Sequence, residues 1–123
     1  MAKILIVDDS SLSRKIMRSI LETEGHEVLE ANGGLAALER YFIDHPDLVL
    51  IDLAMPDMQG TEVLTKLREM DEKARVIIAS ADAQDLTQRA VKAAGALGYI
   101  TKPFAPEAVL EQVNQVLVTG PQL

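Results

Sequence analysis

The sequence predicts an α/β protein built as a doubly wound (βα)5 unit, in which helices cover both faces of a five-stranded parallel sheet. Two observations support this fold class. Five short runs rich in Val, Ile and Leu alternate with amphipathic stretches along the 123 residues, and this alternation is typical of parallel strands joined by right-handed crossovers. Three of the runs are continuously apolar, as expected for strands buried on both faces. We expect the strand order 2-1-3-4-5, one of the two common orders of doubly wound sheets.

The predicted strands are short, and their Val and Ile content favours strands over buried helical turns. They lie at Ile4–Val7, Val28–Ala31, Leu48–Ile51, Val76–Ala79 and Leu97–Ile100. Glu30 interrupts the second run and makes it the most polar. We therefore expect this strand at an edge of the sheet.

Apolar residues at helical spacing predict four amphipathic helices. Their expected core-facing stripes are Leu12, Ile16, Ile20 and Leu21; Leu35, Leu38 and Phe42; Val63, Leu64, Leu67 and Met70; and Val109, Leu110, Val113, Val116 and Leu117. Pro106 suits the first turn of the last helix.

One further helix, which precedes the last strand, is expected from about Ala83 to Ala94. Its apolar face is mostly alanine, with Leu86 and Val91, so it should be the least firmly packed helix. Asp82 is a candidate cap for its start.

Composition excludes several kinds of protein. The chain has no Cys, which rules out disulfides and thiolate metal sites. A net charge of −7 disfavours nucleic acid and membrane insertion. Apolar stretches are shorter than the ~20 residues of a membrane span, and the N-terminal run is too short for a signal peptide. We expect one cytoplasmic domain over residues 1–123, with a core of about 3–118, a frayed end from Thr119 to Leu123 and no output domain.

Polar residues gather where the predicted strands end. Asp8 and Asp9 follow the first strand, Asp52 the third, Ser80 the fourth and Lys102 the fifth. Each alone is explained as a helix cap, a turn residue or an exposed lysine. Ligands of open α/β sheets, however, bind at the carboxyl ends of the strands, beside the reversal of strand order. Here the reversal lies between the first and third strands, which brings three carboxylates together.

Three adjacent carboxylates repel one another, and a folded protein tolerates this when a cation lies among them or when catalysis requires it. Oxygen ligands without Cys or a nearby His favour Mg²⁺ over Zn²⁺. A carboxylate is also a nucleophile toward phosphorus and forms an aspartyl phosphate. In such chemistry Lys102 would supply a positive charge and Ser80 a hydroxyl donor to the phosphoryl group.

Separated motifs, in order, carry a specific resemblance to a known family. They are Ile-Val-Asp8-Asp9, Asp52-Leu-Ala-Met55-Pro56-Asp-Met-Gln-Gly60, Ala79-Ser80-Ala81 and Gly98-Tyr99-Ile-Thr-Lys102-Pro103-Phe104. From Lys3 to about Leu117 the chain resembles the receiver domain of bacterial two-component response regulators, most of all stand-alone members such as the chemotaxis regulator and phosphorelay intermediates. The resemblance implies a flavodoxin-like fold, for which a chemotaxis receiver is a standard example.

The resemblance also implies how the site works. Asp52 is the expected phosphoacceptor. Asp9, Asp52 and the carbonyl oxygen of Ala54 are the expected ligands of Mg²⁺, and Asp8 is expected to act through a metal-bound water. Ala54 and Asp82 stand at positions that tune the lifetime of the phosphoryl group.

The remaining implied roles concern the phosphoryl group and the switch. Ser80 and Lys102 are expected to bind the phosphoryl group, and Ser80 and Tyr99 are expected to move on phosphorylation. The Lys102–Pro103 peptide bond is expected to be cis.

The function implied is a signalling switch and not an enzyme with a separate substrate. A histidine kinase or phosphotransfer protein would donate a phosphoryl group from phosphohistidine. The signal would reach a downstream target protein through the fourth helix, the fifth strand and the fifth helix.

Three alternatives are weighed against this interpretation. A haloacid-dehalogenase-type phosphatase also forms an aspartyl phosphate with Mg²⁺, but it needs an acid where this chain has Ala54. A flavodoxin needs a hydroxyl- and Gly-rich phosphate loop after the first strand, where Asp8 and Asp9 would repel phosphate. A pseudo-receiver, which is a binding module, usually lacks one or more key residues, and this chain keeps all five of those that follow its strands.

Overall fold

A computed structural model of the chain describes residues 1–119, in which strands and helices alternate. The elements are β1 (Lys3–Val7), α1 (Ser11–Glu22), β2 (Glu27–Ala31), α2 (Gly34–Asp44), β3 (Leu48–Ile51), α3 (Gly60–Met70), β4 (Val76–Ser80), α4 (Asp85–Ala93), β5 (Gly98–Thr101) and α5 (Pro106–Thr119). Most of the segment expected to fray, residues 120–123, lies outside the described residues. Within residues 1–119, none of the helices is long and apolar enough to cross a membrane.

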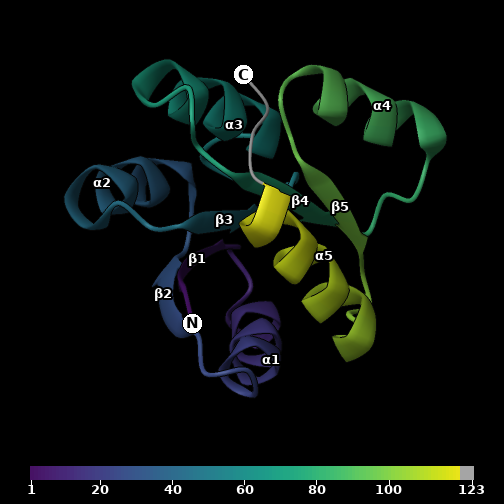
Figure 1. Cartoon of the computed structure of the whole chain (residues 1–123). Coiled ribbons are helices and arrows are strands. Elements are labelled where there is room, and N and C mark those ends of the chain that lie inside the picture. Colours follow the sequence, from purple (N-terminus) through teal and green to yellow (C-terminus); the bar gives the residue numbers. More distant parts are fainter. Residues whose placement is uncertain (120–123) are drawn as a thin grey trace.

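The strands form one parallel sheet in the order β2-β1-β3-β4-β5. This confirms the predicted order and the edge position of the strand that carries Glu30. Figure 1 shows α1 and α5 on one side of the sheet and α2, α3 and α4 on the other. The carboxyl ends of β1 and β3 are adjacent, because Val7 pairs with Ile51.

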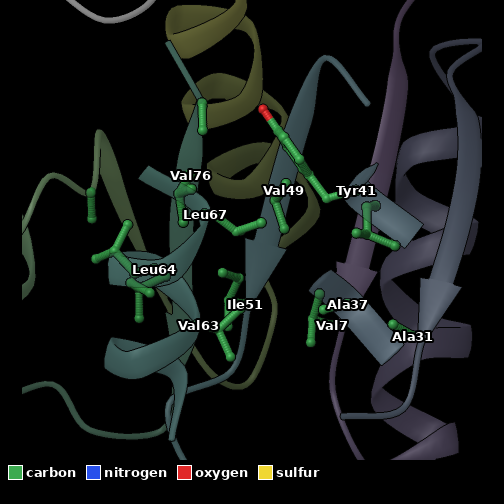
Figure 2. Close-up of a cluster of buried hydrophobic side chains, with 14 of the residues drawn as sticks. Val7, Ala31, Ala37, Tyr41, Val49, Ile51, Val63, Leu64, Leu67 and Val76 are labelled. Carbon is green, nitrogen blue, oxygen red and sulfur yellow. The ribbon is translucent and has the colours of Figure 1, made fainter. Parts of the chain in front are cut away.

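The core consists of two layers, one on each face of the sheet. Successive residues of β1, such as Leu5 and Ile6, belong to different layers, as the alternation of side chains along a strand requires. Figure 2 shows the layer between the sheet and helices α2 and α3, with Val49 and Ile51 of β3 opposite Val63 and Leu67. The second layer packs α1 and α5 against the other face. Burial on both faces explains why β3 is apolar throughout.

Three predicted helix stripes, those of α1, α2 and α3, are partly wrong. In α1, Leu12 and Ile16 are exposed, and the helix buries Met17 together with the predicted Ile20 and Leu21. The amphipathic pattern of this helix extends around more of its surface than the sheet covers, so periodicity alone does not select the buried side.

In α2, Leu35 and Phe42 are exposed, and Gly34, Ala37 and Tyr41 are buried instead. The reason is close packing. A Cβ built on Gly34 would lie 2.9 Å from Val63 Cγ2, so the small residues of α2 face its neighbours and the larger ones point outward.

The helix before β5 is shorter than predicted and begins at Asp85. Val91 is its only buried residue in the described structure, and Leu86 is exposed, which agrees with the expected thin packing. Asp82 is not the N-cap; its carboxylate accepts hydrogen bonds from the Gln84 amide and the Thr87 hydroxyl. In α3, the predicted stripe is buried except for Met70.

A buried histidine makes stability depend on pH. His26 Nδ1 accepts a hydrogen bond from the Ala2 amide at 3.0 Å, and its Nε2 has no partner among the described residues. Burial lowers the pKa of His26, and the nearby N-terminal charge adds to this effect. The unfolded chain therefore takes up a proton more readily than the folded chain once the pH falls below the ordinary pKa of His, about 6.5.

We predict that stability falls as the pH drops through this window, and that His26→Asn, which keeps an acceptor at the Nδ1 position but does not titrate, flattens the dependence. Urea unfolding of both proteins between pH 5 and 7.5 measures the difference. An equal pH dependence in the two proteins would contradict the assignment to His26, because the second histidine, His45, is common to both.

Candidate functional site

The site lies where β1 and β3 end. The Asp8 amide donates to Ala31 of β2 at 3.1 Å, and the Asp52 amide donates to Val7 of β1 at 2.9 Å. Backbone pairing thus continues one residue beyond each strand, and both aspartates start their loops from fixed positions beside the reversal of strand order, as predicted.

Three carboxylates meet at this point. The carboxylate oxygens of Asp8, Asp9 and Asp52 lie within 4.8 Å of one another. Asp8 and Asp52 are buried, and Asp9 is exposed. Asp8 Oδ1 also accepts the Ser10 amide at 2.9 Å, and the Ser10 side chain in turn caps α1. The start of α1 therefore holds Asp8 in place.

Lys102, which follows the edge strand β5, brings a positive charge to the acids. Its Nζ lies 2.8 Å from Asp8 Oδ2 and 3.7 Å from Asp52 Oδ1. Its amide donates to the Ser80 carbonyl at 2.9 Å, and the following Lys102–Pro103 bond is cis, as predicted. The ammonium also lies 5.8 Å from the centre of the Phe104 ring.

The environment of Asp52 is unfavourable for a negative charge. Burial raises the pKa of its carboxyl above the usual range, the charge of Lys102 acts against this, and the charges of Asp8 and Asp9 add to it. A backbone hydrogen bond from Ala54 favours the charged form. A second cation at the site would relieve the remaining repulsion.

The donor set fits Mg²⁺. Three carboxylates face one ammonium group, which leaves the site net negative. Hard oxygen ligands, one of them open to solvent at Asp9, suit an ion that keeps several of its waters. The cluster of Asp8, Asp9 and Asp52 therefore offers oxygen ligands of the kind that Mg²⁺ prefers.

The predicted switch residues lie on neighbouring strands, with Ser80 at the end of β4 and Tyr99 within β5. Ser80 is buried, and its Oγ accepts the Asp82 amide at 3.1 Å. The Tyr99 hydroxyl donates to the carbonyl oxygen of Asp82, and the half-buried ring packs against the core layer of Figure 2. Burial raises the pKa of Tyr99, whereas the interaction with the Ser80 hydroxyl acts to lower this pKa. Ala54 is exposed and Asp82 half-buried.

Sequence reasoning missed a supporting ion-pair network on the edge strand. Arg14 Nη1 donates to the Asp8 carbonyl at 2.6 Å, and Arg14 Nε pairs with Glu30 Oε1 at 2.8 Å. Arg18 Nε pairs with the other Glu30 oxygen at 2.7 Å. Glu30, which interrupts an apolar strand, indicated in the sequence that this strand lies at an edge of the sheet. It did not indicate that Arg14 and Arg18 would pair with it.

The sequence is similar to those of known proteins that share one domain family. Residues 4–114 match the family "Response regulator receiver domain". The chain is 40% identical to the chemotaxis protein CheY of Bacillus subtilis over 94% of its own length and 97% of the relative's. It is 38% identical to sporulation initiation phosphotransferase F of the same species, covering 94% of this chain and 93% of that protein.

A solved structure extends the likeness to three dimensions. The crystal structure of a CheX–CheY–BeF3–Mg complex from Borrelia burgdorferi contains a chain with a TM-score of 0.91 and 33% identity, covering 95% of this chain and 90% of that one. These likenesses favour a receiver over the phosphatase and flavodoxin alternatives.

Proposed function

Because the chain belongs to the response regulator receiver domain family, and is thus a phosphorylation-activated signalling switch of two-component systems, we propose that Asp52 is its phosphoacceptor. The observation that carries this proposal is the position of Asp52. Of the two buried acids, Asp8 has both oxygens engaged, by Lys102 at 2.8 Å and by the Ser10 amide at 2.9 Å, whereas Asp52 lies 3.7 Å from the Lys102 ammonium at the end of β3.

The transfer is an in-line displacement at phosphorus. An oxygen of the ionised Asp52 attacks phosphorus, and the bond from phosphorus to the histidine nitrogen of the donor breaks. That nitrogen keeps the electron pair and takes a proton. Lys102, 3.7 Å from Asp52 Oδ1, neutralises part of the charge on the transferred phosphoryl oxygens, and the Ser80 hydroxyl donates to one of them.

The metal requirement follows from the same charges. We propose that Asp9, Asp52 and the Ala54 carbonyl hold Mg²⁺, with Asp8 acting through a bound water. When bound, Mg²⁺ neutralises the incoming phosphoryl charge. Asp8 has a second task, since its contact with Lys102 at 2.8 Å holds the ammonium at the site before the phosphoryl group arrives.

The switch is a shift between two populated arrangements. Tyr99 already donates to the Asp82 carbonyl, and Ser80 accepts from the Asp82 amide, so one short loop connects the two residues. A phosphoryl group that accepts a hydrogen bond from Ser80 would favour this arrangement over one in which the Tyr99 ring points away from the core, because a ligand stabilises the state that it binds better.

Asp82, whose carboxylate is held by Gln84 and Thr87, stays a candidate for tuning the lifetime of the phosphoryl group together with Ala54.

The output surface is expected over α4, β5 and α5. A cavity of about 290 Å³ on this face is lined by Tyr99, Thr101, Ala105, Ala108, Glu111 and other β5 and α5 residues. Helix α4, whose Val91 belongs to the core layer against which Tyr99 packs, buries little apolar surface, so its position responds readily to a change at Tyr99. A target protein that fills this cavity would sense the state of the ring.

The proposed partners follow from the family. A histidine kinase or phosphotransfer protein donates the phosphoryl group in the cytoplasm, and a target protein receives the signal. No turnover of a separate substrate is expected, because the phosphoryl group leaves Asp52 only to water or to another phosphotransfer protein.

Ser80→Ala tests the coupling. We predict that beryllofluoride with Mg²⁺ still binds at Asp52 in this variant and shifts the amide NMR signals of the β3–α3 loop. The shifts of Tyr99 and α4 seen in the parent should be largely lost, because the variant has no hydroxyl to join the phosphoryl site to the loop.

Ser80→Thr keeps the hydroxyl and serves as the matched control, with parent-like shifts expected. If Ser80→Ala moved the α4 signals as far as the parent does, Ser80 would not carry the signal. A pull-down from host lysate with and without beryllofluoride then identifies the target.

A further inference from the structure

Helix α2 begins at a residue that has no side chain to cap it. Its N-cap is Gly33, and the first amides of a helix need acceptors from outside the helix. Asp57, in the loop between β3 and α3, provides them. Its Oδ1 accepts the Gly34 amide at 3.0 Å, and its Oδ2 accepts the Leu35 amide at 3.1 Å, contacts that span 23 and 22 residues of sequence.

The approach of this loop to α2 is too close for side chains at the start of the helix. A Cβ built on Gly33 would lie 2.8 Å from Asp57 Oδ1, and one on Gly34 would lie 2.7 Å from the Cβ of Met58. Any residue larger than glycine would push the loop away. The two glycines therefore allow Asp57 to reach the helix amides.

The same loop is also held where it leaves β3 and where it enters α3. The Gly60 amide donates to the Leu53 carbonyl at 2.8 Å, and a Cβ on Gly60 would overlap the carbonyl oxygen of Asp52. Met55 is buried in the core layer between the sheet and helices α2 and α3. The Asp57 hydrogen bonds add an attachment on the side of the loop that faces α2.

Ala54 lies inside this loop and brings two backbone groups to the acid site. A backbone interaction with Ala54 acts to lower the pKa of the Asp52 carboxyl, and the Ala54 carbonyl is the proposed Mg²⁺ ligand. We propose that Asp57 is a positioning residue which, by capping α2, holds the loop so that both backbone groups of Ala54 stay at the site. This inference rests on the proposed function.

The experiment separates positioning from simple helix capping. Mg²⁺ alone is titrated into the full chain and followed by backbone NMR, and hydrogen exchange is measured at the Ala54 and Met55 amides, at a temperature where each variant is folded. We expect Asp57→Ala to bind Mg²⁺ about tenfold more weakly, as when groups that orient metal ligands are removed. Exchange at both amides should be faster.

Two variants serve as controls. Asp57→Asn lacks the charge and keeps one of the two acceptor oxygens, so it should lose less affinity than Asp57→Ala. Asp47→Ala also removes a carboxylate that accepts a backbone amide, that of Lys3 at 2.8 Å. It does so at the end of the sheet opposite the acid site, and its Mg²⁺ affinity should equal that of the parent.

Parent-like Mg²⁺ binding by Asp57→Ala would overturn the proposal and leave Asp57 as a helix cap only. Equal losses in Asp57→Ala and Asp57→Asn would also overturn it, since the hydrogen bond that asparagine keeps would then contribute nothing to Mg²⁺ binding. If Asp57→Ala does not fold, Asp57→Glu decides, because it keeps the charge but displaces the carboxylate. Weaker binding supports positioning, and parent-like binding refutes it. A parent chain that binds no Mg²⁺ would instead refute the proposed function, and this inference with it.

Discussion

Asp52→Asn is expected to abolish phosphorylation by acetyl phosphate. The amide has the shape of the carboxylate but is not a nucleophile toward phosphorus. The site supplies Lys102 and the other two acids itself, so a small donor replaces the kinase in this test. Mass spectrometry of the intact protein, at a pH that preserves acyl phosphates, measures incorporation.

The same substitution should make the protein more stable at neutral pH. Burial and the neighbouring acids raise the pKa of folded Asp52 above its unfolded value. The folded state therefore holds the proton more tightly, and the stability that the protonated form contributes is lost as the pH rises through the window between the unfolded and folded pKa values. Above that window Asp52 is ionised and destabilising, and asparagine removes this penalty.

Asp47→Asn is the matched control for both readouts, because it changes a carboxylate at the opposite end of the sheet. It should be phosphorylated like the parent and show no comparable gain in melting temperature. A phosphoryl group found on Asp52→Asn would identify another residue as the acceptor.

Asp9→Ala is expected to reduce the phosphorylation rate by about 100-fold or more, because charge neutralisation by a metal ion lowers the barrier by several kcal/mol. Asp9 is the exposed member of the cluster, so its removal should leave the core and Lys102 in place. Mg²⁺ titration followed by backbone NMR should show that binding is lost, and circular dichroism should show that the fold is kept.

Asp9→Asn refines this test, since it keeps an oxygen ligand but lacks the charge. Intermediate Mg²⁺ affinity is expected. Unchanged affinity in Asp9→Ala would mean that Asp9 is not a ligand, whereas unchanged phosphorylation with lost affinity would mean that transfer does not need the metal.

The sequence by itself determined the sheet and the location of the site. Continuously apolar runs such as Leu48–Ile51 occur where helices cover both faces of a parallel strand, and β3 is buried throughout. Parallel strands all end at one edge, so residues that follow different strands converge without any knowledge of side-chain contacts. Asp8, Asp52 and Lys102 were placed together on this basis, and the structure brings them within hydrogen-bonding or ion-pairing distance.

Only the tertiary structure decided which side of each helix is buried and what holds the site in place. Leu35 and Phe42 point outward because α2 approaches its neighbours through Gly34 and Ala37, a choice set by the space available and not by hydropathy. The Asp57 bonds to α2 join residues more than twenty positions apart. Periodicity describes neighbours along one element, whereas such contacts depend on how two elements are placed, which is established only when the whole chain has packed.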